Sequence, residues 1–110
     1  FSFQSYKMIN AGEGGILMHG SLVNAGVVIG ANAIVNSQAL VEHDAVVGDH
    51  CHIATGARVN GGVRIGDGAF IGSGAVLREG ITVGAGAVIG AGCVVLRDVP
   101  DGTVLRGGHD

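Results

Sequence analysis

The sequence predicts a parallel β-helix, an all-β solenoid that contains 18 residues per coil. An apolar residue stands at every sixth position from Leu17 to Val95 without interruption, and a second small or apolar residue follows each anchor by four positions. Each hexad therefore offers two inward side chains separated by one outward side chain. Because strand side chains alternate between faces, this spacing predicts a three-residue strand followed by a three-residue corner. A period of six fits no α-helix and is typical of stacked coils.

The hexads also predict the organisation of the chain. Three hexads close one coil of a three-sided prism, so the repeat from Leu17 to Val99 gives four to five coils. Gly or Asn follows most anchors, at the positions where the chain has to bend. We expect residues 1–15 to form a lead-in segment outside the repeat, residues 16–100 to form the β-helix and residues 101–110 to form a loosely held C-terminal tail.

Composition narrows the classes of function. The 110 residues contain six basic and nine acidic side chains, and no cluster of Lys or Arg suggests binding to nucleic acid or to an anionic membrane. No apolar stretch is long enough to span a bilayer and no secretory signal is visible, so a cytoplasmic location is expected. Cys51 and Cys93 fall at inward positions on different sides of the prism, which predicts buried free thiols.

Stacked residues differ by 18, which assigns the outward side chains to three faces. The Leu22 face presents Leu22, Leu40, Arg58, Val76 and Val94. The Val28 face presents Val28, Val46, Arg64 and Thr82. The Ile34 face presents Ile34, His52, Phe70 and Val88. The Leu22 and Ile34 faces are too apolar to remain in water, so we expect a homotrimer in which the Leu22 face of one chain packs against the Ile34 face of the next.

The histidines suggest where chemistry takes place. His43 falls at the corner between the Leu22 and Val28 faces, whereas His52 projects from the Ile34 face, so within one chain the two rings cannot share a substrate. The expected trimer contact brings His43 of one chain towards His52 of its neighbour. The carboxylates Glu42 and Asp44 flank His43, and a carboxylate beside an imidazole fixes its tautomer and favours a general base. Gly61 stacks on His43 one coil later, where its N–H can polarise a thioester carbonyl.

Three stretches resemble a known family. Residues 34–44 read IVNSQALVEHD, and residues 47–57 and 90–100 continue the similarity. On these motifs the stretch from Met18 to Pro100 resembles the sugar acetyltransferases of the PglD and NeuD type, which are trimeric hexapeptide-repeat enzymes. The resemblance implies a left-handed β-helix, a known exception to the right-handed crossover rule.

The resemblance also implies a reaction. His43 would be the general base for direct attack of an amino sugar, expected to be nucleotide-linked, on the thioester of acetyl-CoA. Asp44 and Glu42 would be the carboxylates that assist it, and Glu42 and Asn36 would line the acceptor pocket. O-acetylation of a sugar such as sialic acid needs the same base and stays open as an alternative.

The cofactor positions come from the same resemblance. His52 would bind acetyl-CoA near the acetyl carbonyl, and Gly61, Ser73 and Ala91 would follow the pantetheine arm along the seam between subunits. Members of the family usually carry an N-terminal βαβ domain that binds the nucleotide of the acceptor. Residues 1–15 are too short for such a domain.

Two other classes use the same coil. A zinc enzyme of the γ-carbonic anhydrase type needs a histidine two coils, or 36 residues, before another, but the positions 36 residues before His43, His50 and His52 hold Lys7, Gly14 and Ile16. We therefore expect no metal. A non-catalytic trimeric module that lacks its acceptor domain is the remaining alternative.

Overall fold

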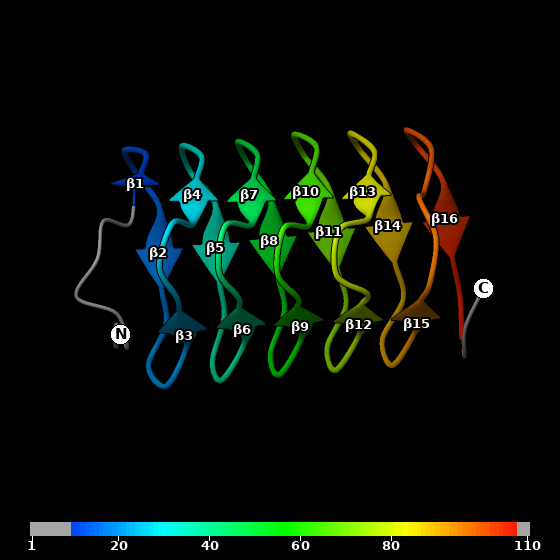
Figure 1. The fold of residues 1–110 in the computed structure, drawn as a ribbon, viewed down its shortest axis with the longest axis horizontal. Coiled ribbons are helices and arrows are strands. Elements are labelled where there is room, and N and C mark those ends of the chain that lie inside the picture. Colours follow the sequence, from blue (N-terminus) through cyan, green and yellow to red (C-terminus); the bar gives the residue numbers. More distant parts are fainter. Residues whose placement is uncertain (1–9, 108–110) are drawn as a thin grey trace.

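The computed structural model describes residues 10–107, which wind into a solenoid of about five coils (Figure 1). Each strand pairs in parallel with the strand three places away in the chain, one coil along, except at the C-terminal end, where the last strand pairs with the strand two places before it. Paired residues differ by 18 in sequence over most of the chain, as do Arg64 and Thr82. The all-β fold class and the 18-residue coil are therefore confirmed.

Three sheets form the sides of the prism, one for each expected face. The sheet of the Val28 face contains β1 (Asn10–Ala11), β4 (Val28–Ile29), β7 (Val46–Val47), β10 (Arg64–Ile65) and β13 (Thr82–Val83). The sheet of the Ile34 face contains β2 (Ile16–Leu17), β5 (Ile34–Val35), β8 (His52–Ile53), β11 (Phe70–Ile71), β14 (Val88–Ile89) and β16 (Val104–Leu105). The sheet of the Leu22 face contains β3 (Leu22–Val23), β6 (Leu40–Val41), β9 (Arg58–Val59), β12 (Val76–Leu77) and β15 (Val94–Val95).

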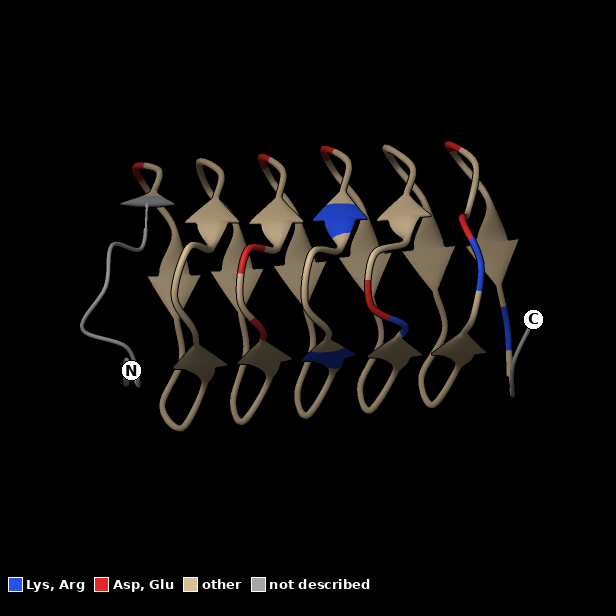
Figure 2. Cartoon of the chain, in the orientation of Figure 1, with Lys and Arg blue, Asp and Glu red and all other residues tan. Residues whose placement is uncertain are grey.

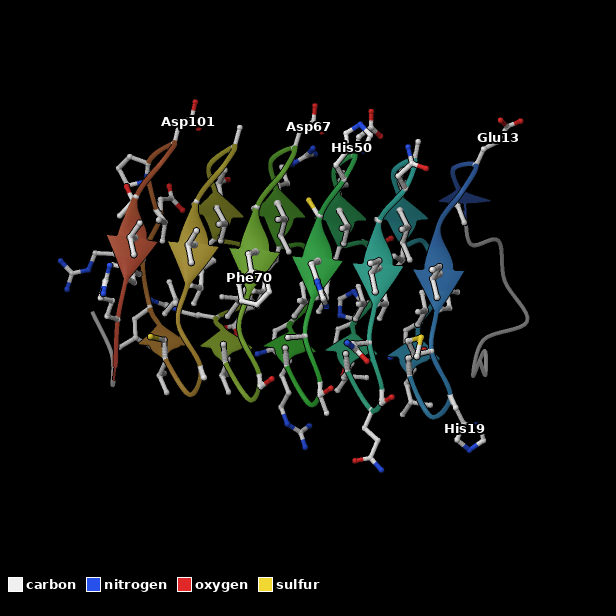
Figure 3. All side chains as sticks on the ribbon, turned by 180° about the vertical axis from the view of Figure 1, so that it is seen from behind. Glu13, His19, His50, Asp67, Phe70 and Asp101 are labelled. Atoms are coloured by element: carbon white, nitrogen blue, oxygen red, sulfur yellow. The ribbon has the colours of Figure 1, made fainter. Side chains whose placement is uncertain are left out.

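The coil is left-handed. In Figure 1 the chain advances from left to right, and the strands of the Val28 face lie towards the viewer and point upward. Figure 3 shows the molecule from behind, where the strands of the Ile34 face are nearest to the viewer. These strands point downward in Figure 1. A chain that rises on the near side and descends on the far side while it advances to the right forms a left-handed helix.

The interior is filled by the two inward residues of each hexad. The anchor side chains from Val23 to Val95 are at most 3% exposed, and the small residues between them are buried as well. Ser21 is the buried polar residue of the described core, and its hydroxyl donates to the Met18 carbonyl at 2.8 Å. Burying an aliphatic side chain contributes about 1.5–3 kcal/mol, so the periodic anchors hold the coils together.

The strands are shorter than the spacing predicts. Each contains two paired residues, because the N–H of the small inward residue closes the preceding corner. Ala57 donates to the Ala54 carbonyl and Ala75 to the Gly72 carbonyl, both at 3.1 Å. The inward direction of these residues is as expected, but their N–H groups belong to the turn.

The solenoid extends beyond the expected range 16–100 at both ends. β1 pairs with β4, although it lies in the segment 1–15 that was expected to fall outside the repeat. β16 pairs with β14, so the segment 101–110 contributes a strand instead of leaving the coil after Pro100. Residues 1–9 and 108–110 of these segments lie outside the described part.

A shortened corner explains the difference at the C-terminal end. Val99 bridges to Val83 and Leu105 pairs with Ile89, so partners in the last coil are 16 residues apart. The corner after Val95 has therefore lost two residues, and the phase of the hexads moves by two. Val99 is 4% exposed and takes the place of an anchor. A strict six-residue count cannot follow the chain past this point.

Three rows of corners join the sheets, and Figure 2 shows that most of the charged residues lie on them or at the C-terminal end. The histidine corner, between the Leu22 and Val28 faces, comprises residues 24–26, 42–44, 60–62 and 78–80. The aspartate corner, between the Val28 and Ile34 faces, comprises residues 30–32, 48–50, 66–68 and 84–86. The small-residue corner, between the Ile34 and Leu22 faces, comprises residues 36–38, 54–56, 72–74 and 90–92.

Candidate functional site

An open depression of about 630 Å³ lies on the histidine corner. It spans three coils, and its lining consists of Glu42, His43, Asp44, Asn60, Gly61, Gly62, Glu79 and Gly80. These residues occupy equivalent corner positions 18 residues apart. The winding of the chain therefore brings together groups that are up to 38 positions apart in sequence.

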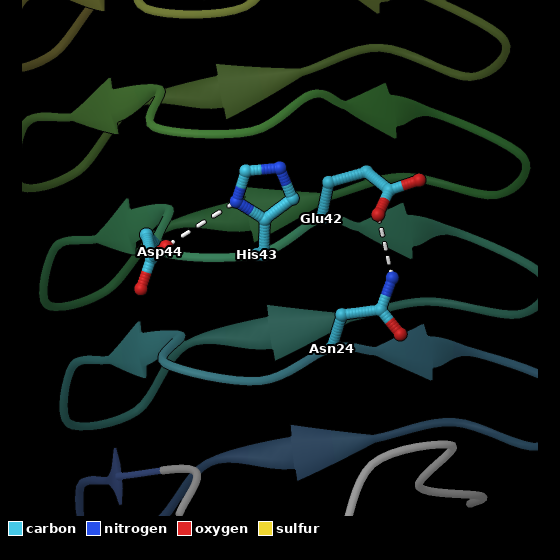
Figure 4. Close-up of polar contacts among 4 residues, drawn as sticks. All are labelled: Asn24, Glu42, His43 and Asp44. Atoms are coloured by element: carbon cyan, nitrogen blue, oxygen red, sulfur yellow. Dashed lines mark hydrogen bonds and ion pairs between the residues drawn. The ribbon is translucent and has the colours of Figure 1, made fainter. Parts of the chain in front are cut away.

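His43 and Asp44 form a pair at the rim of this depression. Nδ1 of His43 lies 3.3 Å from Oδ2 of Asp44, as Figure 4 shows. The two side chains are 69% and 73% exposed, so this contact orients the ring without burying it. Asp44 has a φ of 60°, in the left-handed region that favours glycine. With Nδ1–H donating to the carboxylate, Nε2 is left as the free basic nitrogen.

Glu42 points away from His43 towards the preceding coil. Its Oε1 accepts a hydrogen bond of 2.6 Å from Nδ2 of Asn24 (Figure 4). Nδ2 of Asn60, on the following coil, donates to the Leu77 carbonyl at 2.8 Å. Both amides therefore hold the corner in place, and Glu42 presents a fixed carboxylate at the side of the depression.

Gly61 lies directly against the His43 ring. A Cβ added to Gly61 would lie 2.7 Å from both Cε1 and Nε2 of that ring. The absence of a side chain lets the imidazole rest on the backbone of the next coil. Within the described chain, the Gly61 N–H donates to no acceptor, so this donor is open on the residue against which the ring rests.

The aspartate corner shows what the equivalent N–H groups do elsewhere. The N–H of Ala31 donates to Oδ1 of Asp49 at 2.8 Å, and the N–H of Asp49 donates to Oδ1 of Asp67 at 2.8 Å. The N–H of Ala85 donates to Oδ1 of Asp101 at 2.9 Å. At these three positions a carboxylate from the next coil satisfies the donor. Gly61 has no such carboxylate below it, since the stacked Glu79 forms no hydrogen bond to it.

A second polar group lies on another side of the prism. Nδ2 of Asn36 is 3.3 Å from Nε2 of His52, and Oδ1 of Asn36 accepts a hydrogen bond of 2.7 Å from the Ser37 N–H. The His52 ring meets Phe70 edge to face, with centroids 5.3 Å apart and planes at 74°. Figure 3 shows Phe70 in the middle of the Ile34 face.

The expected site residues thus fall into three places within one chain. His43, Asp44, Glu42 and Gly61 share the depression, whereas Asn36 and His52 form the second group. Ser73 and Ala91 are found together at the small-residue corner, where their N–H groups donate to no acceptor in the described chain. Asn36 was expected to line the pocket, but one chain alone does not bring it to His43.

The sequence reasoning missed four of the residues that line the depression, namely Asn60, Gly62, Glu79 and Gly80, and Glu79 is the one of them that carries a charge. Glu79 lies 36 residues after His43 and so two coils away on the same corner. Glu79 lies 18 positions after Gly61, so the periodicity of the coil is the signal that locates it. His19 and His50 are exposed at other corners (Figure 3), and His109 lies outside the described residues.

Other features of the site region are simple. Cys51 and Cys93 are free and buried, as the sequence predicts. Burial raises the pKa of the Cys51 thiol above its ordinary value of 9.0. Across residues 10–107 no three or more His, Cys, Asp or Glu side chains are grouped to hold a metal ion. The same stretch contains no helix of the length and apolarity that a membrane crossing requires.

The hexad-built prism with a histidine and carboxylate at one of its corners defines the class: a hexapeptide-repeat β-helix protein. The chain belongs to the bacterial transferase hexapeptide family, whose six-repeat profile matches residues 26–61 and 62–97. No curated protein matches the chain in sequence.

Three solved structures are similar over nearly the whole chain. The acetyltransferase domain of PglB from Neisseria gonorrhoeae, in complex with acetyl coenzyme A, is 38% identical over 96% of this chain, with a TM-score of 0.92. A histidine mutant of perosamine N-acetyltransferase from Caulobacter crescentus, in complex with CoA and GDP-perosamine, is 40% identical over 96%, with a TM-score of 0.93. WeeI from Acinetobacter baumannii is 35% identical over 92%, with a TM-score of 0.89. The chain spans about half the length of each of these proteins, 51%, 50% and 50% respectively.

Proposed function

We propose that this chain is the acetyl-CoA-dependent catalytic part of a sugar N-acetyltransferase. The observation that carries the proposal is the His43–Asp44 pair at an open depression, with the His43 ring resting on Gly61, whose N–H is unused within the described chain. Solved structures with 38% and 40% identity contain acetyl coenzyme A in one case and CoA with GDP-perosamine in the other. The chemistry of the corner fits a reaction between such partners.

His43 acts as the general base. Its Nδ1–H donates to Asp44, so Nε2 is free to take a proton from the acceptor amine. The amine nitrogen attacks the carbonyl carbon of the acetyl thioester, the carbon–sulfur bond breaks, and the proton removed from nitrogen goes to the departing CoA thiolate. The products are the N-acetylated sugar and CoA. No acyl-enzyme forms, because the amine attacks the thioester directly.

Gly61 supplies electrostatic assistance. As the amine attacks, negative charge develops on the thioester oxygen, and a fixed N–H donor stabilises that charge. The Gly61 N–H is unused within the described chain, and the His43 ring rests on this glycine. The equivalent N–H groups of Ala31, Asp49 and Ala85 are capped by aspartates, so this type of donor is open at Gly61 and closed at those three positions of the aspartate corner.

The complete site requires a second copy of the chain. His43 and Asp44 are more than two-thirds exposed, and His52 lies on a different face of the prism. The Ile34 and Leu22 faces expose apolar side chains, among them Phe70 and Val94, each 38% exposed. Packing these faces together as a homotrimer covers them and brings His52 of one chain towards His43 of the next. Ser73 and Ala91 then line the seam along which the pantetheine arm is bound.

The charge of the depression favours an amine over a hydroxyl acceptor. Glu42, Asp44 and Glu79 contribute carboxylates, and none of the residues that line the depression is Lys or Arg. Such a lining attracts an ammonium group and repels an anionic sugar such as a sialic acid. We therefore place an amino sugar first, with its nucleotide lying outside the depression. The nucleotide and the cytoplasmic location stay predictions.

Calorimetry and a thiol-release assay test the proposal. Acetyl-CoA should bind the purified protein with micromolar affinity, and a nucleotide-linked amino sugar should release free CoA. The substitution His43→Ala should lower turnover by about 10²–10⁴-fold, whereas His50→Asn, at an exposed neighbouring corner, should leave it unchanged. Full turnover in His43→Ala would refute the mechanism. A folded protein that binds no acetyl-CoA would instead be a structural module, and a monomer at working concentration would remove the shared site.

A further inference from the structure

We propose that Asn36 is a positioning residue, which holds neutral His52 as the tautomer with hydrogen on Nδ1. His52 then serves the proposed reaction as a hydrogen-bond donor and not as a base. The donor role rests on the proposed function. The tautomer itself rests only on contacts within this chain, so it can be tested without any ligand.

The orientation of the Asn36 amide is fixed by its neighbour. The Ser37 N–H donates to the Asn36 side chain at 2.7 Å, and only the carbonyl oxygen of an amide can accept. The other end of the amide, Nδ2, must therefore be the atom that faces His52. The backbone N–H of Asn36 also donates to the Ile53 carbonyl at 2.8 Å, which anchors Asn36 beside His52.

The tautomer of His52 follows from that orientation. Nδ2 of Asn36 lies 3.3 Å from Nε2 of His52, and an amide nitrogen is a donor only. Nε2 must then be the accepting nitrogen, which places the hydrogen on Nδ1. In the part of the chain that is described, Nδ1 of His52 has no hydrogen-bond partner. The edge-to-face contact with Phe70 at 5.3 Å holds the ring plane.

His43 and His52 are prepared in opposite ways. Asp44 accepts from Nδ1 of His43, so the free nitrogen of that ring is basic. Asn36 donates to Nε2 of His52, so the free nitrogen of that ring carries hydrogen. At the proposed seam the first ring removes a proton from the acceptor, and the second donates to an oxygen. The acetyl carbonyl or a pantetheine amide carbonyl has the chemistry that this donor recognises.

Nitrogen NMR of the ligand-free protein tests the tautomer. In long-range ¹H–¹⁵N spectra, recorded at a pH where His52 is neutral, Nδ1 should show the shift of a protonated ring nitrogen and Nε2 that of an unprotonated one. In Asn36→Asp the side chain still accepts from Ser37, but its second oxygen faces Nε2 and can only accept. The ring hydrogen should therefore move to Nε2. The matched control Asn32→Asp, at an exposed corner away from His52, should leave the His52 shifts unchanged.

The outcomes separate this inference from the proposed function. A protonated Nε2 in the wild-type protein, or an unchanged tautomer in folded Asn36→Asp, would overturn the role of Asn36. Acetyl-CoA should bind Asn36→Asp about tenfold more weakly than wild type, because the donor has been turned away. Equal affinity in the two proteins would overturn the donor role. If the wild-type protein shows the expected tautomer but binds no acetyl-CoA, the proposed function fails and the tautomer assignment stands.

Discussion

Replacing Gly61 by alanine should separate the position of His43 from the stability of the fold. The new Cβ would lie 2.7 Å from Cε1 and Nε2 of the ring, and ordinary contacts begin at 3.4 Å. The ring must therefore retreat by at least about 0.7 Å, which also pulls Nδ1 from Asp44, now 3.3 Å away. A displacement of about 1 Å in a reacting group can cost about 10²-fold in rate. We expect a loss of that size in turnover.

Stability should hardly change in Gly61→Ala. The backbone of Gly61 is not in the left-handed region, and Ala25 occupies the same corner position two coils earlier. Removing glycine lowers the entropy of the unfolded chain and stabilises by about 0.4–1 kcal/mol. The exposed His43–Asp44 pair, whose loss offsets this gain, is worth about 0–1 kcal/mol. Urea denaturation should place the variant within about 1 kcal/mol of wild type.

A double-mutant cycle identifies the cause of the lost rate. If the only effect of the new methyl group is to displace the imidazole, adding Gly61→Ala to His43→Ala should cause no further loss of turnover. The His43 ring signals in ¹H–¹³C spectra should shift in the single variant. A destabilisation of several kcal/mol would refute the reasoning, because the backbone would then require glycine at this position. Full turnover with unmoved ring signals would also refute it, because the new methyl group would then not displace the imidazole.

Three further predictions concern single side chains. Asp44→Gly should stabilise the fold by up to about 1 kcal/mol in urea denaturation, since φ is 60° there, yet lower turnover; a less stable variant would contradict the assigned strain. Glu79→Gln should lower kcat/KM for an amine acceptor severalfold, and the affinity for acetyl-CoA should change little. An unchanged kcat/KM would show that this carboxylate does not attract the acceptor. The pKa of the Cys51 thiol is raised in the folded state, so above pH 9.0 the folded protein keeps a proton that the unfolded chain releases. The free energy of unfolding should therefore fall as the pH rises above 9.0. Relative to Cys51→Ala, wild type should lose up to about 1.4 kcal/mol per pH unit, and parallel pH profiles would exclude this linkage.

Much of the fold could be predicted because one physical rule repeats along the chain. The alternation of inward and outward side chains fixes the anchors, the faces and the 18-residue stacking, so Gly61 could be placed on His43 by counting. The same counting failed where the chain drops two residues after Val95. A deletion in a corner leaves no compositional mark, and the pairings of Val99 with Val83 and of Leu105 with Ile89 reveal it.

The site was less predictable because it depends on side-chain directions. Counting places Asn36 and His52 on neighbouring coils, but it does not say that the amide reaches back to the ring, nor that Ser37 fixes the amide. The hydrogen bond between Glu42 and Asn24 likewise depends on rotamers. Periodicity determines where each Cβ lies. The contacts of long polar side chains depend in addition on their rotamers, which the periodicity does not determine.

The distribution of backbone strain connects the fold to the site. Asn32, Gln38, Asp44 and His50 occupy positive φ at four successive corners, whereas glycine takes this position at the described corners on either side. A left-handed non-glycine residue costs about 1 kcal/mol. One complete turn of the solenoid is therefore less stable than the turns that have glycine at this position. That turn carries both His43 and Asn36. The fold tolerates the backbone strain of this turn, because the buried anchors pack each coil against its neighbours above and below. Of the four residues, Asp44 connects this strained turn to the site directly, because its carboxylate orients the His43 ring.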